Sequence, residues 1–524
     1  MSAATAETVG RADGRRGYAG ARHANLTAML ADTARRVGAK TAFVDERGEI
    51  AWAAFHAESE ALAGRLAARG IGAGDRVALL FGNGIPYTVA VWAVWRLGAI
   101  AVPLNGRLLA GEMVPLVRDA DAALLLGGEP LADTAAEVAA AAGVPCALAD
   151  ADGALLAGEP SAALPGADVA DRETAAAIMY TSGTTGRPKG VVITHGNLME
   201  NSRTCIDVIG RREDDVELVC VPQFNITGLG SQTVPVVDVG MTGLLVPRFE
   251  TPLVLETIAR HRATSTVLAP TMWWRLLEDE RFATTDVSSL RLALFGGAPM
   301  PTALLQRMRD AFAGATFGNG YGMTETCSMV TYIGGRELLD HLDSVGRPLP
   351  ITEIRVVDPV TGEDCAEGEP GELWFRGPQV SRGYWRNEEA TAALFAEDGW
   401  LRTGDAGSLD ADGFVTLRDR LKDVIKRGGE SIYCFEVENV LHQHPAVLEA
   451  AVVGVPDEVY GETVAAVVAF KPGATATADE LREFCRRHLA RFKVPRRVTV
   501  VDALPRNAGG KVLKARLRDL AAAS

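Results

Sequence analysis

A glycine- and hydroxyl-rich segment that ends in a lysine is the part of this sequence best suited to chemistry. It runs from Tyr180 to Gly190 as YTSGTTGRPKG. Glycines let backbone N–H groups approach an anion, hydroxyl groups add donors, and Lys189 adds a positive charge, so the segment suits a di- or triphosphate. Its flanks, 176–179 and 191–194, predict two strands, and the Walker A pattern is absent. The alternative is a flexible surface linker.

Three further segments place a charged side chain close to glycine or threonine. They are YGMTE, ending at Glu325, WLRTGD, ending at Asp405, and PRNAGGK, ending at Lys511. A carboxylate such as that of Asp405 can accept hydrogen bonds from both hydroxyls of a ribose, although an isolated aspartate there is more often a turn former. Taken alone, Glu325 would form a surface ion pair and Lys511 would be a solvated lysine.

In their order along the chain, these segments resemble the motifs of the adenylate-forming enzymes, the superfamily of acyl-CoA synthetases, adenylation domains and luciferases. The resemblance includes GGAP at 296–299, which is similar to the family's adenine-side turn, and RLKD at 420–423, which is similar to its hinge. It covers almost the whole chain, from Asn25 to Lys514. One motif alone would be weak, but the ordered set is specific.

The resemblance implies a role for each motif. Mg²⁺ would be held by Thr181 and Glu325, since this cation prefers oxygen ligands. Lys511 would be the catalytic lysine, bridging the attacking carboxylate and the α-phosphate of ATP. Lys422 would be the hinge of a rotating domain, the alternative being an exposed linker lysine. The residues implied to bind ATP are Thr181, Ser182, Gly183, Thr184, Thr185, Gly186, Lys189, Gly297, Ala298, Pro299, Asn319, Gly320, Tyr321, Gly322, Met323, Thr324, Asp405, Arg420 and Lys511.

The acid side departs from the family pattern at one position. Where acyl-CoA synthetases usually carry Pro-x-Phe-His-x-x-Gly, residues 222–228 read PQFNITG, so Asn225 replaces the histidine. Asparagine keeps hydrogen-bonding capacity but has no titratable nitrogen. The change is either neutral within a CoA ligase or a sign of a different acceptor or nucleophile, and Gln223 adds a nearby polar group. The predicted substrate pocket consists of Phe224, Asn225, Gly228, Trp273, Gly320, Thr326 and Met329.

Aromatic bulk and hydroxyl groups in that pocket favour a short or aromatic acid, although a buried tryptophan can simply be part of the core. A basic stretch at 491–497 (RFKVPRR) suits a phosphate-bearing partner such as CoA, and a solvated charge run would look the same. His195 fits the family's Thr-His-x-Asn-Leu helix start, where it is more often structural than catalytic. Glycine patterns at 70–74 and 318–322 do not fit a dinucleotide-binding turn.

The elements that must position these residues alternate between strands and helices. Short apolar runs at 77–80, 99–104, 266–269 and 290–295 predict buried strands, and 87–97 predicts a helix. We therefore expect an α/β fold with mostly parallel sheets, followed by a small mobile α+β domain. In the latter, 450–453 and 464–470 predict strands, and Thr477 with Glu480 has the spacing of a capping box. The expected organisation is a flexible tail (1–24), a large N-terminal domain of several subdomains (25–420) and a small C-terminal lid (421–524).

Composition limits the possible partners. The 524 residues include 53 Lys and Arg against 67 Asp and Glu, a formal charge of −14, which disfavours nucleic acid and anionic membranes. The seven cysteines contain no Cys-x-x-Cys pair. With no apolar stretch near the ~18 residues that span a bilayer, we expect a cytoplasmic protein without disulfides or membrane insertion.

The sequence thus predicts a ligase that uses ATP and Mg²⁺ to adenylate a carboxylic acid, releasing pyrophosphate, and passes the acyl group to CoA. The alternative keeps adenylation but uses another acceptor: a carrier protein in trans, an amine, or nitrite with an aromatic amine, as in diazotases. An inactive nucleotide-binding protein is disfavoured because Thr181, Lys189, Glu325, Asp405 and Lys511 are all present.

Overall fold

The computed structural model describes residues 8–10, 16–20, 22–166, 169–181, 188–298, 300–506 and 512–522. The chain divides into two compact units. The first consists of Met1–Met300, Gln306–Ile354 and Phe375–Leu401, and the second of Pro301–Leu305, Arg355–Trp374 and Arg402–Ser524. Each is described by itself below.

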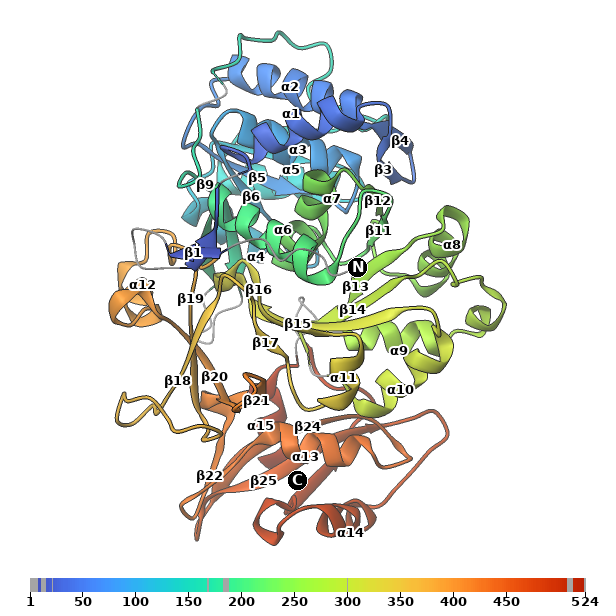
Figure 1. The fold of residues 1–524 in the computed structure, drawn as a ribbon, viewed down its shortest axis with the longest axis vertical. Coiled ribbons are helices and arrows are strands. Elements are labelled where there is room, and N and C mark those ends of the chain that lie inside the picture. The colour runs from blue at the N-terminus through green and yellow to red at the C-terminus, as the bar shows by residue number, and fades with distance from the viewer. Residues whose placement is uncertain are drawn as a thin grey trace. The chain divides into compact units, whose positions relative to one another are not determined.

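The first unit contains a six-stranded sheet in the order β10-β9-β6-β5-β7-β8 (Figure 1). All neighbouring pairs are parallel except β9 and β10, which form an antiparallel hairpin. Val77 and Leu79 enter one core and Ala78 and Leu80 another, as expected of a strand buried on both faces. The strands are β5 (Arg76–Leu80), β6 (Ile100–Pro103), β7 (Leu124–Gly127), β8 (Cys146–Leu148), β9 (Ala175–Thr181) and β10 (Lys189–Thr194).

A second, nine-stranded sheet has the order β17-β16-β15-β14-β13-β11-β12-β3-β4. Its central pairs are parallel, and antiparallel pairing occurs at β15–β16, β16–β17 and β3–β4. The loops after the parallel strands therefore leave the sheet at one edge. The strands are β3 (Thr41–Asp45), β4 (Gly48–Ala51), β11 (Val216–Val219), β12 (Thr242–Leu245), β13 (Ser265–Leu268), β14 (Leu292–Gly296), β15 (Thr316–Met323), β16 (Ser328–Gly334) and β17 (Arg347–Pro348).

Helix α3 (Ile85–Arg96) is the central helix of the first unit's core, and ten of its residues are buried. Its apolar sequence leaves no polar face, so it packs on all sides. Trp92 and Trp95 lie edge to face at 4.8 Å, and the Trp95 indole donates to the Ala176 carbonyl of β9 at 2.8 Å. Figure 1 shows α3 beside α1 and α2 at one end of this unit.

The first unit and the segments joined to it contain further helices up to residue 400. They are α1 (Leu26–Val37), α2 (Trp52–Ala68), α4 (Ala110–Asp119), α5 (Ala132–Ala142), α6 (His195–Ile209), the π-helical turn η1 (Thr227–Thr233), α7 (Val234–Val239), α8 (Thr251–His261), α9 (Pro270–Glu278), η2 (Glu280–Thr284), α10 (Thr302–Ala311), η3 (Thr324–Thr326), α11 (Arg336–Asp340), α12 (Glu388–Leu394) and η4 (Glu397–Gly399).

The N-terminal segment contains a short strand pair, β1 (Thr8–Gly10) and β2 (Arg16–Tyr18). Tyr18 is buried, its hydroxyl donates to Thr204 Oγ1 at 3.1 Å, and the Arg203 guanidinium lies 4.1 Å from its ring centroid. The segment predicted as a flexible tail, residues 1–24, thus contains an aromatic side chain that contacts α6.

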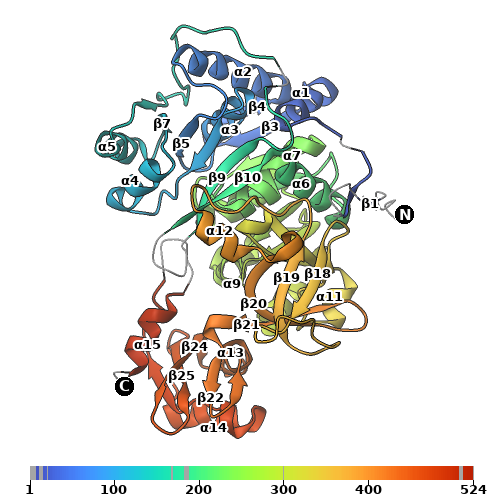
Figure 2. The same ribbon diagram turned by 90° about the vertical axis from the view of Figure 1, so that its left-hand side faces the viewer.

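The second unit contains a four-stranded and a five-stranded sheet (Figure 2). The first is formed by β18 (Glu353–Val357), β19 (Gly371–Arg376), β20 (Leu401–Leu409) and β21 (Val415–Arg420). The second is formed by β22 (Ile425–Arg427), β23 (Glu430–Ile432), β24 (Val447–Asp457), β25 (Gly461–Phe470) and β26 (Arg497–Val500), with η5 (Leu421–Asp423), α13 (Cys434–His442), α14 (Ala478–His488), η6 (Arg491–Lys493) and α15 (Lys514–Ala522).

Alternating residues of β24 and β25 build two cores. Val452 contributes to the core under α13 and α14, whereas Val453 contributes to the core under α15. The predicted capping box at the start of α14 is confirmed, since Thr477 Oγ1 accepts from the Glu480 amide and Glu480 Oε2 accepts from the Thr477 amide. The predicted fold class, α/β with mostly parallel sheets and a small α+β part, is also confirmed.

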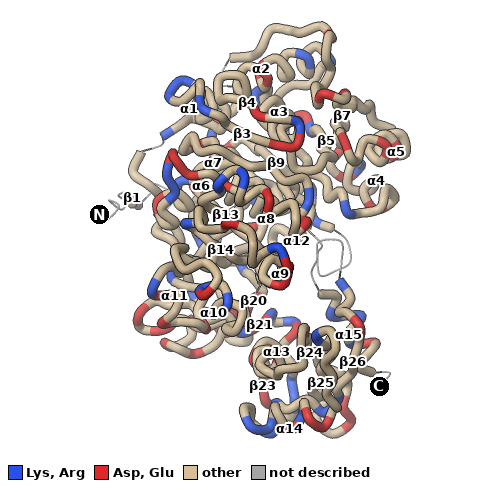
Figure 3. Tube along the Cα trace, turned by 90° about the vertical axis from the view of Figure 1, so that its right-hand side faces the viewer, with Lys and Arg blue, Asp and Glu red and all other residues tan. Residues whose placement is uncertain are grey.

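The compact units do not divide at the predicted boundary, residue 420. Residues 402–420 belong to the second unit, together with the distant segment 355–374, because β18, β19, β20 and β21 are hydrogen-bonded into one sheet. Lys and Arg are interspersed with Asp and Glu in each unit (Figure 3). Every helix in the described part of the chain is too short or too polar to cross a membrane.

We expect Trp92→Ala to lower the free energy of unfolding by about 3–5 kcal/mol, because it opens a cavity in a close-packed core. Chemical denaturation followed by circular dichroism measures this change. Leu109→Ala is the matched control, since Leu109 is 74% exposed, and should change stability by less than about 0.5 kcal/mol. Equal effects of the two substitutions would contradict the assignment of Trp92 to the core.

Candidate active site

The candidate phosphate loop connects the hairpin strands β9 and β10. Thr181 and Lys189 are register partners at the loop end of the hairpin, and the Thr181 hydroxyl donates to the Lys189 carbonyl at 3.4 Å. The prediction that two strands flank this loop is therefore confirmed. The loop residues Ser182, Gly183, Thr184, Thr185 and Gly186 lie outside the described residues.

Glu325 and Lys189 meet at the side chain of Tyr384, a residue that the sequence reasoning did not select. The Tyr384 hydroxyl donates to Glu325 Oε1 at 2.9 Å. Lys189 Nζ lies 4.9 Å from the centroid of the same ring, within the range of a cation–π interaction. Glu325 is 7% exposed, so its carboxylate lies in a largely desolvated position. The tyrosine thus joins the predicted phosphate-binding lysine to the predicted metal-binding carboxylate.

Backbone pairing explains how Tyr384 reaches this position. The segment around it runs along the edge of β10, with Val192 N donating to Gly383 O at 2.9 Å and Trp385 N donating to Gly190 O at 2.7 Å. Ser381 N donates to Glu325 O at 2.8 Å. Gly383 has φ 104°, a conformation that favours glycine. The only sequence signal was the Gly-Tyr pair, which is too short to reveal this long-range contact.

The predicted adenine-side turn and the Tyr-Gly-Met-Thr-Glu motif lie at the ends of neighbouring strands, β14 and β15. Gly296 of β14 is the register partner of Gly320 of β15. A Cβ atom at Gly296 would lie 2.5 Å from the Gly320 carbonyl oxygen, so the close approach requires glycine. Gly297 and Ala298 are exposed immediately after β14, whereas Pro299 lies outside the described residues. Asn319, Gly320, Tyr321, Gly322, Met323 and Thr324 are all half-buried on β15 and at the start of η3.

Some of the predicted pocket residues come together. A Cβ atom on Gly320 would lie 2.4 Å from Met329 Sδ, so these two residues are in contact across β15 and β16. Phe224 and Asn225 are half-buried in the loop after β11, and Asn225 O accepts from Leu229 N at 3.0 Å. Gly228 lies in η1, where a Cβ atom would meet Pro222 O at 2.3 Å.

Two other residues of the predicted pocket, Thr326 and Trp273, form their hydrogen bonds with the protein backbone. The Thr326 hydroxyl donates to Ser328 O at 2.9 Å and accepts from Met323 N at 3.0 Å, so it shapes a turn. Trp273 is completely buried, its indole donates to Leu294 O at 3.0 Å, and its ring packs against Phe312. The structure gives Trp273 a core role.

The Gln223 side chain is buried in the core and forms several hydrogen bonds there. Its amide nitrogen donates to Thr88 Oγ1 at 3.2 Å and Thr233 Oγ1 at 3.0 Å, and its amide oxygen accepts from Gly84 N at 3.3 Å. The side chain is 1% exposed. The hydrogen bonds of Gln223 therefore hold the loop after β11 in place. Of the two polar residues, Asn225 is the more accessible.

In the second unit, the predicted ribose-binding residues form an ion pair. Arg420 Nε lies 2.7 Å from Asp405 Oδ1, and the two residues are register partners in β21 and β20. Asp405 N donates to Thr403 Oγ1 at 3.0 Å, which fixes the turn before the carboxylate. Lys422 is exposed in η5, and Lys511 lies outside the described residues.

Two of the four basic residues in the stretch 491–497 form ion pairs within their own unit. Lys493 pairs with Glu436 at 2.6 Å and Arg496 with Asp457 at 2.6 Å, while Arg497 donates to the Ala521 carbonyl at 3.2 Å. These contacts weaken the interpretation of the stretch as a phosphate-binding patch.

His195 has the structural environment expected of it. Its Nδ1 accepts from Leu26 N at 3.3 Å, and burial lowers the pKa of the imidazole to about 4. The ring is therefore neutral near pH 7 and supports the start of α1.

Comparison with known proteins agrees with this geometry. Residues 30–385 match the AMP-binding enzyme family, and residues 436–511 match the C-terminal domain of AMP-binding enzymes. The feruloyl-CoA synthase of an Amycolatopsis species is 38% identical over 460 residues, which cover 87% of this chain and 91% of that protein.

Two solved structures show the same fold over most of the chain. The o-succinylbenzoate CoA synthetase MenE of Bacillus subtilis, in complex with ATP and magnesium ion, has a TM-score of 0.84 and 35% identity, covering 94% of this chain and 99% of MenE. The amide bond synthetase McbA of Marinactinospora thermotolerans has a TM-score of 0.85 and 30% identity, with coverage of 94% and 99%. The match of sequence, fold and motif order shows that this chain belongs to the AMP-binding enzyme family.

Proposed function

We propose that this protein is an AMP-forming acid–CoA ligase. In the first half-reaction, a carboxylate attacks the α-phosphate of ATP, giving an acyl-adenylate and pyrophosphate. In the second, the CoA thiol attacks the acyl carbon, giving a thioester and AMP. The observation that carries the proposal is the contact of Tyr384 with both Lys189 and Glu325, because it brings together the cation and the carboxylate that a magnesium–triphosphate substrate needs.

The oxygen groups at this position suit Mg²⁺. Glu325 offers a buried carboxylate, one oxygen of which accepts from Tyr384, and Thr181 offers a hydroxyl beside the phosphate loop. When bound, Mg²⁺ would offset the negative charge of the phosphates. Lys189 would bind the phosphate oxygens, and Asp405 with Arg420 would orient the ribose. MenE, solved with ATP and magnesium ion, supports this assignment.

The proposed acid is short or aromatic, and the reaction is proposed to be cytoplasmic. The names of relatives such as the feruloyl-CoA synthase support an aromatic acid. All seven cysteines, each within the described residues, are free thiols, as expected of a reducing compartment.

A second candidate function is transfer of the acyl group to an amine. Two observations favour it: Asn225 replaces the family's histidine at the acid side, and Lys493 and Arg496 of the basic stretch proposed for CoA are paired with Glu436 and Asp457. The similarity to the amide bond synthetase McbA supports the same alternative. Transfer to a carrier protein, or activation of nitrite for an aromatic amine, retains the same first step.

A substrate panel distinguishes these candidates. The enzyme is incubated with Mg·ATP and fatty, aryl or amino-aryl acids, and separately with CoA, an amine, a carrier protein, or nitrite with an aromatic amine. Mass spectrometry then identifies the products. We expect a CoA thioester of an aryl acid. An amide formed without CoA would favour transfer to an amine. ATP consumption only with nitrite and an aromatic amine would contradict both candidates and favour activation of nitrite.

Tyr384→Phe tests the contact that carries the proposal. The variant keeps the ring beside Lys189 but loses the hydrogen bond to Glu325, and hydrogen bonds to charged groups contribute about 1.5–3 kcal/mol. We therefore expect kcat/KM for Mg·ATP to fall about tenfold or more, and half-saturation to need more Mg²⁺, in an ATP–pyrophosphate exchange assay. Tyr18→Phe, which removes the hydrogen bond to Thr204, is the matched control and should leave the Mg²⁺ dependence unchanged. Identical Mg²⁺ curves for both variants would contradict the role of Tyr384.

Lys511→Met tests the catalytic lysine implied by the resemblance. We expect ATP–pyrophosphate exchange to fall ~10²–10³-fold, because the positive charge that stabilises the transition state is lost. ATP binding, measured by calorimetry, should persist. Lys426→Met replaces an exposed lysine of the same unit and should retain activity. Exchange by the Lys511 variant at the unmutated level would exclude the assigned role.

A further inference from the structure

A completely buried ion pair lies next to the π-helical turn η1. Arg211, just after α6, and Glu217, on β11, have side chains with no solvent exposure, and Arg211 Nη2 lies 3.3 Å from Glu217 Oε1. Burying two charges costs desolvation free energy that their attraction often fails to recover, so apolar residues of similar size are frequently as stable. The pair is therefore better explained by what it positions than by the stability it provides.

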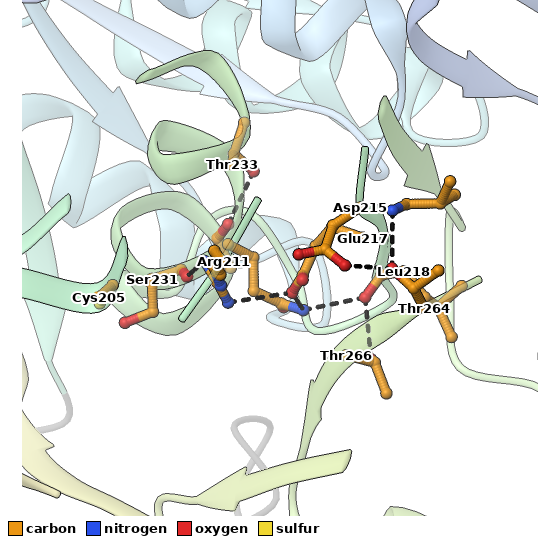
Figure 4. Close-up of polar contacts among 12 residues, drawn as sticks. Cys205, Arg211, Asp215, Glu217, Leu218, Ser231, Thr233, Thr264 and Thr266 are labelled. Atoms are coloured by element: carbon orange, nitrogen blue, oxygen red, sulfur yellow. Dashed lines mark hydrogen bonds and ion pairs between the residues drawn. The ribbon is translucent and has the colours of Figure 1, made fainter. Parts of the chain in front are cut away.

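Both members of the pair are connected to η1. Arg211 Nη1 donates to the Ser231 carbonyl at 2.5 Å. Gln232 Nε2 donates to Glu217 Oε1 at 2.9 Å and to the Leu218 carbonyl at 2.9 Å. Figure 4 shows the Arg211 side chain between the turn that carries Ser231 and Thr233 and the strand that carries Glu217 and Leu218. Two consecutive residues of the turn, Ser231 and Gln232, are thus hydrogen-bonded to the buried pair.

Two more side chains hold the same turn. Asn201 of α6 donates to Gly230 O at 2.9 Å, and Thr233 Oγ1 donates to Gly228 O at 2.7 Å. Together with Arg211, they satisfy three carbonyl groups of η1. π-Helical turns are rare and occur frequently at functional sites. Here the turn's shape is fixed by side chains from several elements.

The turn also connects the two segments proposed to flank the acid. Asn225 directly precedes η1, and its carbonyl accepts the Leu229 amide. On the other side, Ser231 Oγ lies 2.5 Å from Ser328 Oγ, close in sequence to Glu325. Ser328 has φ 98°, a strained conformation for a residue with a side chain, which persists only where the surroundings determine it.

The polar cluster is not fully satisfied. Arg211 Nε, Glu217 Oε2 and Gln232 Oε1 are buried atoms without a hydrogen-bond partner among the residues that the structure describes. Unpaired buried polar atoms are costly, and native proteins keep few of them. Their concentration in one cluster is further evidence that stability alone does not explain these residues.

We propose that Arg211, Glu217 and Gln232 are positioning residues for acid recognition. They hold η1 in one shape, so that Asn225 at its start and the Ser231–Ser328 contact within it keep a fixed separation around the acid. The inference rests on the proposed function, because it assigns these residues to the acid and not to ATP. Their loss should therefore change the KM for the acid and leave the KM for ATP unchanged.

The test uses the double variant Arg211→Met/Glu217→Leu, which removes both charges and so leaves no unpaired buried ion. We expect the KM for the best acid of the substrate panel to rise about tenfold, since small displacements in a site have large effects. The KM for ATP should stay within about twofold of the unmutated value. Hydrogen exchange, followed by mass spectrometry, should become faster in residues 227–233.

The matched control is Arg291→Met/Asp215→Leu. This neighbouring pair is joined at 2.5 Å, with Asp215 buried and Arg291 partly exposed, and it connects the start of β11 to the start of β14. It should leave both KM values and the exchange of residues 227–233 unchanged. If the first double variant does not fold, Gln232→Met removes only the amide link and should change the same quantities in the same direction.

Unchanged hydrogen exchange in residues 227–233, or an equal rise of the KM for the acid and the KM for ATP, would overturn the positioning role. Failure of the proposed function gives a different result, because the unmutated enzyme would then show no acid-dependent ATP–pyrophosphate exchange with any acid. In that case the assignment to an acid is overturned. The hydrogen-exchange measurement on residues 227–233 still decides whether the Arg211–Glu217 pair holds the turn.

Discussion

The hydrogen bond from Tyr384 to Glu325 joins parts of the first unit that are far apart in sequence. Tyr384 follows a backbone pairing along β10, whereas Glu325 follows β15 of the nine-stranded sheet. Through the cation–π contact with Lys189, the same side chain reaches the phosphate-loop hairpin. Because one rigid ring touches both charged groups, their separation depends on the packing of both sheets. The proposed ATP chemistry therefore requires the two sheets to be correctly assembled.

Parallel strand order gives the acid side its position. β11, β13, β14 and β15 are neighbours, so the segments after them leave at the same edge of the sheet. Close backbone approach then determines which residue types fit: Gly296 lies against the Gly320 carbonyl, and Gly320 lies against Met329. Polar side chains at this edge serve different purposes. Gln223 and Thr326 complete hydrogen bonds within the fold, whereas Asn225 remains half-buried at the proposed acid side.

Charge acts locally in this protein. The formal charge of −14 does not describe the environment of any one site. Lys189 lies beside an aromatic face, Arg420 is paired with Asp405, and Lys493 and Arg496 are paired with Glu436 and Asp457. Arg211 and Glu217 form an ion pair away from solvent, where a charge without a partner would be strongly unfavourable. Each pair therefore restrains the elements that carry its two members.

The sequence by itself determined the order of the motifs, the strand and helix pattern, and residue types such as Thr181, Lys189 and Glu325, because local spacing and chemistry are written directly in the chain. It did not reveal the burial of Tyr18 against α6, and it suggested a pocket role for Trp273, which packs in the core. Only the tertiary structure brought Tyr384 to Glu325 and Arg211 to Ser231. These contacts depend on strand order and on desolvation, which arise when segments distant in sequence pack together and which no local pattern records.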